Sequence, residues 1–442
     1  MRIRVVGLPA VLCSAAWLAA VGARARAEIT LAPIFGAGAI LQRDAPLTIW
    51  GTAQDAERIS VTLNGHHVTT VASNGKWHAV FPAMKAAGPV TLEVAGSNTI
   101  VRHELWIGEV FLCTGGRLVS APLPTGSTPG TLDQAPPVRV LYAGSNAGQA
   151  GWQEARSAMP SAAMFAFAQA LRQSTHTAVG LVVAVDRSAP ISSWIAPGSE
   201  PGSPAAVTTA TAAGPAFSKL IAPLAPYSFG AVILAPGVAD LAEASAWRAR
   251  AGWLISGWRK LWSQPLPFVL VQAPGHTGPG SMGGWPELRE AELGASTTTA
   301  GVALVVTADL APDDASGDKN PSTIIGQRLA ATVQMFGSGF TGGPTGPRPI
   351  GMQREMNQFL VTFDHVGKGL IAPGGELDGF EVQDKGGLWH PAEAFIRRGN
   401  TAIVFCEGVD PPAAVRYGWA DAPQMNLANS DGAPVSPFRL TP

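Results

Sequence analysis

The sequence predicts an α/β protein in which a doubly wound parallel sheet is flanked by N-terminal and C-terminal β-sandwich domains. Three observations predict this class. Largely apolar runs without period-two alternation are typical of buried parallel strands. Amphipathic helical segments separate these runs, an order typical of a doubly wound sheet. Alternating segments with hairpin signals lie on either side. The apolar runs are 138–143, 179–185, 229–235, 267–273 and 301–307.

Residues 28–104 are predicted to form the N-terminal β-sandwich, because polar and apolar residues alternate at period two and turn dipeptides interrupt them. The run ISVTL at 59–63 leads into Asn64-Gly65, and Asn74-Gly75 precedes a second run at 77–81. Asn-Gly pairs favour the tight turns that connect antiparallel neighbours.

Residues 105–337 are predicted to form the α/β domain, whose helices show in the spacing of apolar residues. One helical face is formed by Met164, Phe167, Ala168 and Leu171. A second is formed by Trp247, Ala251, Leu254, Trp258 and Leu261. Both sets follow the period of an α-helix.

Four of the apolar runs are expected to be neighbouring parallel strands, with a ligand cleft beyond their carboxyl ends. They are 110–113, 179–185, 231–235 and 303–307. A segment rich in Pro, Gly, Ala, Ser and Thr at 196–214 is predicted to be a surface loop.

The chain is predicted to close with a β domain at 350–442. A Gly- and Pro-rich stretch at 337–349 is typical of a linker. Beyond it, strands are expected at 358–363, 380–383 and 401–406.

Composition limits the partners. The chain of 442 residues is 46% hydrophobic and only 14% charged, with a net charge of −1. No field of one sign therefore draws it to nucleic acid or to anionic lipid. We expect a small molecule or a neutral polymer as partner and no nucleic acid; the oligomeric state stays open.

Residues 1–27 are typical of a secretory signal peptide. Arg2 and Arg4 precede an apolar run at 5–21, and the small-residue sequence ARA ends at Ala27. The run is short for a membrane span and contains Pro9. We therefore expect export to the periplasm or the cell exterior, cleavage near Ala27 and no membrane span in the mature chain.

Two cysteines, Cys113 and Cys406, remain after that cleavage. Both lie in apolar runs of different predicted domains. A disulfide is one interpretation in an exported protein, and two buried free thiols are the favoured one.

The run GEVFLCTGGRL at 108–118 resembles the nucleophile block of the sialate O-acetylesterase-like family of SGNH hydrolases, roughly GEVWLCSGQSNM. Further matches are ILQRD at 40–44 and IWG at 49–51 near the start, and VRYGWAD at 415–421, NL at 426–427 and SPFR at 436–439 near the end. The resemblance covers nearly the whole mature chain. It implies a flavodoxin-like, three-layer SGNH domain and the activity of a carbohydrate O-acetylesterase.

The same resemblance places four catalytic elements, and each position is substituted. Arg117 stands at the nucleophilic serine, but a guanidinium offers only donors and cannot attack an ester. Arg187 and Ser188 fill the glycine positions of an oxyanion hole. Asp240 stands at the oxyanion-hole asparagine, as an acceptor where a donor is needed. Asp318 stands at the histidine base. A pseudoenzyme is therefore predicted.

Two interpretations remain for the charged residues at the old cleft. In the first they pair with one another, because charges in a partly closed site rarely stay unpaired, and Arg117 contacts Asp240 or Asp318. In the second, the two guanidiniums bind the carboxylate of a uronic or sialic acid. The residues are Arg117, Asp186, Arg187, Asp240 and Asp318.

A relocated active site is a further alternative. Ser120 lies three residues beyond Arg117, and His276 follows the apolar run 267–273 near the same end of the sheet. A pair of these side chains would restore a nucleophile and a base if their reacting atoms met.

No cofactor is predicted. The histidines show no spacing typical of a zinc site, so no metal is expected either. Trp77 and Trp389, in the predicted β domains, are candidates for stacking against a sugar ring.

Three functions remain open. The first is an inactive member of the carbohydrate O-acetylesterase family that binds a carbohydrate or an acidic sugar. The second is an active ester hydrolase that uses non-standard residues. The third is a structural envelope protein without a ligand.

Overall fold

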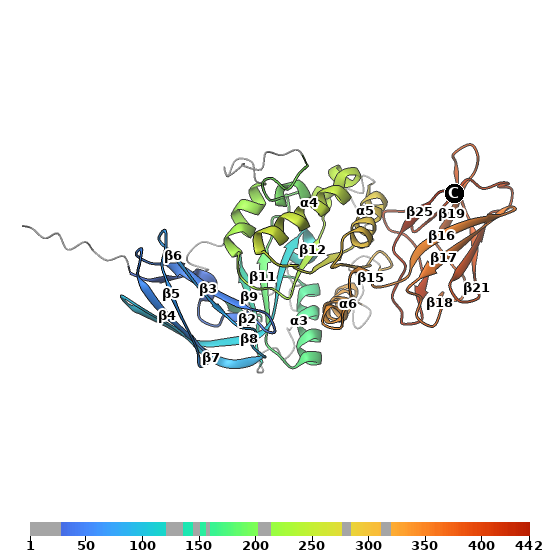
Figure 1. Cartoon of the computed structure of the whole chain (residues 1–442). Coiled ribbons are helices and arrows are strands. Elements are labelled where there is room, and N and C mark those ends of the chain that lie inside the picture. Colours follow the sequence, from blue (N-terminus) through green and yellow to red (C-terminus); the bar gives the residue numbers. More distant parts are fainter. Residues whose placement is uncertain are drawn as a thin grey trace, which may run out of the picture.

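The computed structural model describes residues 28–120, 136–144, 151–155, 160–201, 214–275, 284–310 and 320–442. Four predictions fall wholly or mostly outside these ranges: the signal peptide at 1–27, the surface loop at 196–214, His276 and Asp318. An amino-terminal β region, a central α/β region and a carboxy-terminal β region follow one another along the molecule (Figure 1).

A parallel sheet forms the centre of the molecule, in the order β9-β11-β8-β12-β13-β14. Every neighbouring pair in this series is parallel. From β11 to β14 the order is that of a flavodoxin-like sheet, with β9 added at one edge. The prediction of parallel strands is confirmed, with β13 between β12 and β14. The strands are β8 (Thr99–Gly115), β9 (Val138–Tyr142), β11 (Val179–Ala184), β12 (Ala231–Ala235), β13 (Phe268–Val271) and β14 (Val302–Val305).

Two short strands complete the edges of this sheet. β10 (Gln153–Glu154) is antiparallel to β9, and β15 (Gly343–Pro344) is parallel to β14. The linker predicted at 337–349 is therefore wrong in part, because its backbone supplies the last strand of the sheet.

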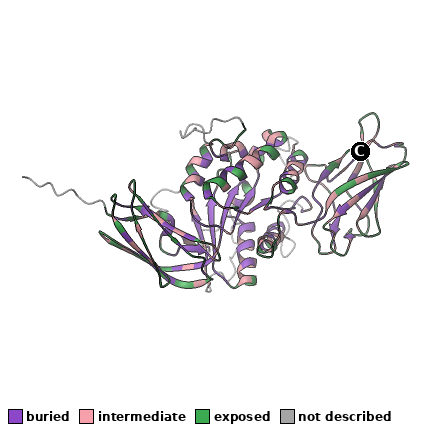
Figure 2. Cartoon of the chain, viewed as in Figure 1, coloured by how far each residue is buried: buried purple, intermediate pink, exposed green. Residues whose placement is uncertain are grey.

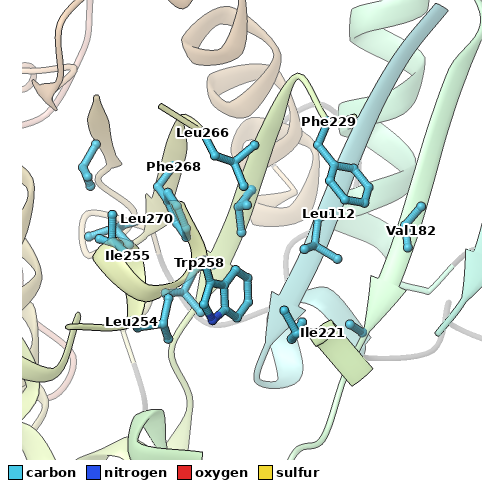
Figure 3. Packing of buried hydrophobic residues seen from close by; sticks show 14 of the residues in the cluster. Leu112, Val182, Ile221, Phe229, Leu254, Ile255, Trp258, Leu266, Phe268 and Leu270 are labelled. Atoms are coloured by element: carbon cyan, nitrogen blue, oxygen red, sulfur yellow. The ribbon is translucent and has the colours of Figure 1, made fainter. Parts of the chain in front are cut away.

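Helices cover both faces of the sheet (Figure 1). α3 (Ala162–Thr175) and α6 (Pro321–Phe336) pack with Phe111 and Cys113 of β8 on one face. α4 (Ala244–Trp262) and α5 (Trp285–Thr298) pack on the other face with Leu112. Figure 3 shows this second core, with Leu112 and Trp258 labelled. The alternation follows from the strand, because successive side chains point to opposite faces.

The predicted helix faces are largely confirmed. The four apolar residues expected on α3 are all buried. On α4 the other four residues of the predicted face are buried, but Leu261 is 38% exposed and that expectation is wrong. Trp262 takes the buried position instead, and its indole N–H donates to the Tyr227 carbonyl at 2.8 Å.

The amino-terminal strands form a three-stranded sheet and an extension of the central sheet. β8 pairs with amino-terminal strands in its first half and with β11 and β12 in its second half. The predicted boundary at 104 therefore falls inside one continuous strand. The strands are β1 (Thr30–Leu31), β2 (Ile40–Gln42), β3 (Leu47–Thr52), β4 (Arg58–Leu63), β5 (His66–Val71), β6 (Lys76–Phe81) and β7 (Ala87–Ala95).

The carboxy-terminal region is built from two four-stranded antiparallel sheets and one short pair. Purple, buried positions line the interior between them (Figure 2). The strands are β16 (Arg348–Glu355), β17 (Gln358–Asp364), β18 (Leu370–Ile371), β19 (Phe380–Gln383), β20 (Trp389–Pro391), β21 (Glu393–Arg397), β22 (Thr401–Phe405), β23 (Ala414–Tyr417), β24 (Ala428–Asn429) and β25 (Phe438–Leu440).

Short helices occupy several connections: α1 (Arg117–Ser120), η1 (Pro33–Phe35), η2 (Ile191–Trp194), η3 (Phe217–Ile221), η4 (Ala222–Leu224) and η5 (Val238–Glu243). Within the described ranges, no helix has the length and apolar character needed to cross a bilayer. Cys113 and Cys406 are both free thiols. Cys113 is buried as expected, whereas Cys406 is only half-buried, so that part of the expectation is wrong.

Candidate active-site cleft

The candidate site lies where the strand order of the central sheet reverses. The chain passes from β8 towards β9 and β11 on one side, and β12 lies on the other side. In sheets of this order, ligands bind outside the carboxyl ends of the strands at the reversal. Three loops meet there: 115–117 after β8, 185–190 after β11 and 236–240 after β12.

Glycines allow two of these loops to touch. Gly115 has a φ of +115°, and a Cβ there would lie 2.0 Å from the Ala235 carbonyl oxygen. A Cβ on Gly116 would lie 2.8 Å from the Cα of Gly237. The Gly116 N–H donates to the Ala235 carbonyl at 2.7 Å. Side chains at these positions would separate the loops, so the glycines allow the loops after β8 and β12 to stay in contact.

Arg117 is the first residue after this glycine turn and begins α1. Its side chain is exposed. It forms no hydrogen bond or ion pair with any residue that the structure describes. The expected contact with Asp240 is therefore wrong, and Asp318, the other expected partner, lies outside the described residues. The guanidinium faces solvent at the end of β8.

Asp240 is buried, with 6% exposure, and its partners are backbone groups. Oδ1 accepts from the Ile191 N–H at 2.8 Å, and Oδ2 accepts from the Gly237 N–H at 2.8 Å. Burial raises the pKa of Asp240 to about 6, while those two N–H donors oppose the rise. The carboxyl group thus joins the loop after β11 to the loop after β12, and it does not bind the expected cation.

Arg187 and Ser120 form a second link across the cleft. Arg187 Nε donates to Ser120 Oγ at 2.8 Å, and Nη2 donates to the Ser120 carbonyl. Ser120 Oγ itself donates to the Gly116 carbonyl at 3.1 Å. The serine hydroxyl therefore faces a guanidinium. His276, its candidate base, lies outside the described residues, so their pairing stays a prediction.

Asp186 and Ser188 close a local turn after β11. Asp186 Oδ1 accepts from the Ser188 N–H at 3.0 Å and from its hydroxyl at 2.7 Å. The Ser188 N–H, expected at the oxyanion hole, is thereby already engaged. Within the described part of the chain, Arg117, Asp186, Arg187 and Asp240 pair with backbone or hydroxyl groups or with nothing, and not with one another.

Sequence reasoning missed a set of buried polar groups close to Asp240. Glu292 on α5 has 0% exposure; neither carboxyl oxygen meets the geometry of a full hydrogen bond, and the Ala273 N–H is the backbone donor that faces it. The indole N–H of Trp247 faces the Asp240 carboxyl group and lowers its pKa, although it does not meet the geometry of a full hydrogen bond. Glu292 lies four residues after Leu288 and three before Ala295, both buried, so the helical period alone would have placed it inside.

Burial raises the pKa of Glu292 well above its usual range. The Arg289 guanidinium opposes this rise, and the Asp240 carboxyl group adds to it. Two further buried atoms have no hydrogen-bond partner. They are Thr114 Oγ1, at the end of β8, and Gln272 Oε1, directly after β13. Buried polar atoms therefore lie near the carboxyl ends of these strands as well as in the loops that follow them.

The two tryptophans expected to stack on sugars are otherwise engaged. Trp77 is 1% exposed and its N–H donates to the Thr30 and Thr52 carbonyls, so that expectation is wrong. The ring of Trp389 is half-buried, and the Arg416 guanidinium lies 4.3 Å from its centre. No three His, Cys, Asp or Glu side chains of the described chain gather as metal ligands.

No protein-family model matches this chain, and no curated protein matches it in sequence. Among solved structures, a carbohydrate acetylesterase from Xanthomonas citri superposes with a TM-score of 0.80 and 26% identity, over 93% of this chain and 99% of that one.

Two further solved structures are less similar. A protein from Arabidopsis thaliana shows a TM-score of 0.35 and 17% identity, over 52% of this chain and 98% of that one. A family two carbohydrate esterase from Cellvibrio japonicus shows a TM-score of 0.28 and 12% identity, over 66% of this chain and 85% of that one. Overlaps this weak carry no argument. The similarity to the Xanthomonas citri enzyme, over nearly the whole of both chains, supports a carbohydrate-esterase family for this chain.

Proposed function

We propose that this chain is a carbohydrate-esterase-like protein that binds an acidic sugar and does not hydrolyse esters. The observation that carries the proposal is Arg117, exposed and unpaired among the described residues, at the turn where the resembled enzymes present their nucleophile. Its guanidinium remains protonated at physiological pH and therefore cannot attack a carbonyl carbon.

The described neighbours of Arg117 do not replace what is lost. Acyl transfer needs a hydroxyl activated by a base and N–H donors aimed at the developing oxyanion. The Ser120 hydroxyl contacts the Arg187 guanidinium, which is no base. The Ser188 N–H donates to Asp186, and Asp240 offers an acceptor. The cleft therefore supports binding more than catalysis.

An acidic sugar fits the free guanidinium. Carboxylates bind arginine through two parallel hydrogen bonds, a geometry that lysine cannot reproduce. Arg117 has no competing carboxylate among its described neighbours. A uronic or sialic acid would therefore meet an unoccupied cation at the end of β8. Residues 1–27 are typical of a signal peptide, and export of the chain would bring it to such glycans.

We expect the wild-type protein to hydrolyse aryl acetates and acetylated sugars no faster than buffer, because nucleophile and base act as a unit and their loss costs about a million-fold in turnover. The measurement is release of acetate, with the Xanthomonas citri carbohydrate acetylesterase as positive control. Labelling by a serine-reactive fluorophosphonate checks the same point directly.

One pattern would sink this proposal. If wild-type protein is labelled and hydrolyses acetate esters, and if Ser120→Ala or His276→Ala abolishes both, the active site has been relocated. Arg117→Ser alone is expected to remain inactive, because the other catalytic groups stay substituted.

Binding of galacturonate oligomers should weaken at least about tenfold in Arg117→Ala, and Arg117→Lys should recover only part of it. Isothermal titration calorimetry at low salt measures the change. Arg102→Ala, on the distant half of the same strand β8, is the matched control and should bind as wild type. Equal affinities in Arg117→Ala and Arg102→Ala would remove Arg117 from the site.

A further inference from the structure

A groove runs between α3 and α6, and its lining residues are not among those that join the loops after β8, β11 and β12. It has a volume of about 310 Å³. This value lies at the lower end of the range of roughly 300–1,000 Å³ found for small-molecule sites. Its walls include Phe165, Gln169 and Gln173 from α3, and Thr323 and Gln327 from α6.

The two helices approach closely enough to form this groove because Gly326 faces α3. A Cβ at Gly326 would lie 2.5 Å from the Ala166 Cβ and 2.5 Å from the Phe167 backbone nitrogen. Ala162, Ala166 and Ala170 form the small side of the groove. The alanines therefore form the bottom of the groove, and the longer side chains of both helices form its walls.

Most of the residues that line the groove are polar and uncharged. None of the described lining residues is charged. The amides of Gln169, Gln173 and Gln327 form no hydrogen bond with any other described residue. Asn320 uses Oδ1 to cap α6, accepting from the Ser322 N–H at 2.9 Å, and its Nδ2 donors remain. The groove thus presents several amides and one half-buried aromatic ring.

We propose that this groove binds a neutral saccharide chain. A side-chain amide offers a donor and an acceptor side by side, which matches two neighbouring hydroxyl groups of a sugar. The Phe165 ring offers an apolar face for the C–H side of a pyranose. The absence of charge from the described lining disfavours a uronic acid here, in contrast to Arg117.

This inference rests on the proposed carbohydrate-binding function for the class of ligand, and on separate residues for the site. A glycan that carries both neutral and acidic units would engage the groove through the neutral ones. The proposal for Arg117 and the proposal for the groove can therefore be disproved independently.

Titration calorimetry with cellotetraose, xylotetraose and mannotetraose tests the groove, with tetragalacturonate as the charged comparison. At least one neutral tetrasaccharide should bind the wild-type protein. Gln169→Ala combined with Gln327→Ala should weaken it at least about fivefold for each hydrogen-bonded amide lost. Gln173→Ala, at an exposed position where folding is insensitive to truncation, gives a second reading.

Gln334→Ala is the matched control, because Gln334 lies on α6 outside the groove and its amide donates to the Ala330 carbonyl. Gln334→Ala should bind the neutral tetrasaccharide as wild type. The inference is overturned if no neutral tetrasaccharide binds, if the glutamine variants keep wild-type affinity, or if Arg117→Ala removes the binding. Preference of the groove for an uncharged peptide over all three sugars would overturn it as well.

Discussion

Replacing Arg289 by methionine should lower the free energy of unfolding by about 3–5 kcal/mol, the range for removing one member of a buried, fully hydrogen-bonded ionic group. Arg289 lies on α5 with 0% exposure. Its Nε donates to the Ala273 carbonyl at 2.9 Å, and Nη2 donates to the Pro274 carbonyl at 2.8 Å. Toward the carboxy-terminal region, Nη1 donates to Ala420 at 2.7 Å and Nη2 to Asp421 at 2.8 Å.

The loss of stability in Arg289→Met should be greatest where the central α/β region contacts the carboxy-terminal region. One guanidinium joins the end of β13 to residues 420–421, and methionine would leave these carbonyls without their donor. Burial lowers the pKa of Arg289 to about 10, so the side chain stays cationic at neutral pH. Calorimetric unfolding measures the stability, and hydrogen exchange at 420–425 reports whether the carboxy-terminal region has loosened.

Arg439→Met is the matched control for this prediction. Arg439 connects the same regions, since Nη2 donates to Glu290 of α5 at 2.9 Å, but its side chain is 45% exposed. Solvent screens such a pair, and its removal should change stability by no more than about 1 kcal/mol. If both variants lose the same free energy of unfolding, the burial of Arg289 does not make its hydrogen bonds stronger than the exposed pair of Arg439.

The central sheet was predictable because strands that are buried on both faces are apolar at nearly every position. Strands β11, β12, β13 and β14 are continuous apolar runs, and no surface strand produces that pattern. Helix α5 was not predictable in the same way. Glu287, Arg289 and Glu290 interrupt its apolar period, and two of its charged residues are nevertheless buried.

The edge strand β15 was missed for a different reason. Its Gly343 and Pro344 have low intrinsic strand preference, and the neighbouring strand β14 supplies the reason for their extended backbone. Local composition indicates a linker there, whereas a partner far away in the sequence makes it a strand.

At the cleft, the sequence could place residues but not their partners. The strand ends bring Arg117, Arg187 and Asp240 to one side of the sheet, as expected. Pairing among charges was then the natural assumption, but backbone N–H groups satisfy Asp240 instead. Such donors exist at every residue, so only the geometry of the loops decides which of them face a carboxylate.

Glu292→Gln should stabilise the protein by about 1–3 kcal/mol at pH 8, because burial raises the pKa of the Glu292 carboxyl group and the folded state must therefore hold a proton or bury a charge that glutamine does not carry. Glutamine has the same shape and no proton to release. Chemical denaturation of wild type and variant at one pH gives the difference. Glu287→Gln is the matched control on the same helix, at an exposed position, and should change stability little.

The pH dependence identifies the cause of that stabilisation. The folded pKa of Glu292 is raised above the unfolded value of about 4.3, so the folded state binds the proton more tightly. Stability is then greatest below the unfolded pKa and falls as pH rises towards the folded value. Asp240 acts in the same direction, but only up to its folded pKa of about 6.

A comparison above pH 7 therefore separates the two groups, because Asp240 is ionised there in both states and contributes no slope. Between pH 7 and 8, wild-type protein should lose stability with rising pH and Glu292→Gln should lose less; at higher pH the buried Cys113 thiol, whose pKa is also raised, adds the same slope to both proteins. Parallel profiles for the two proteins would mean that Glu292 titrates normally, and that water reaches the space between α5 and the end of β13.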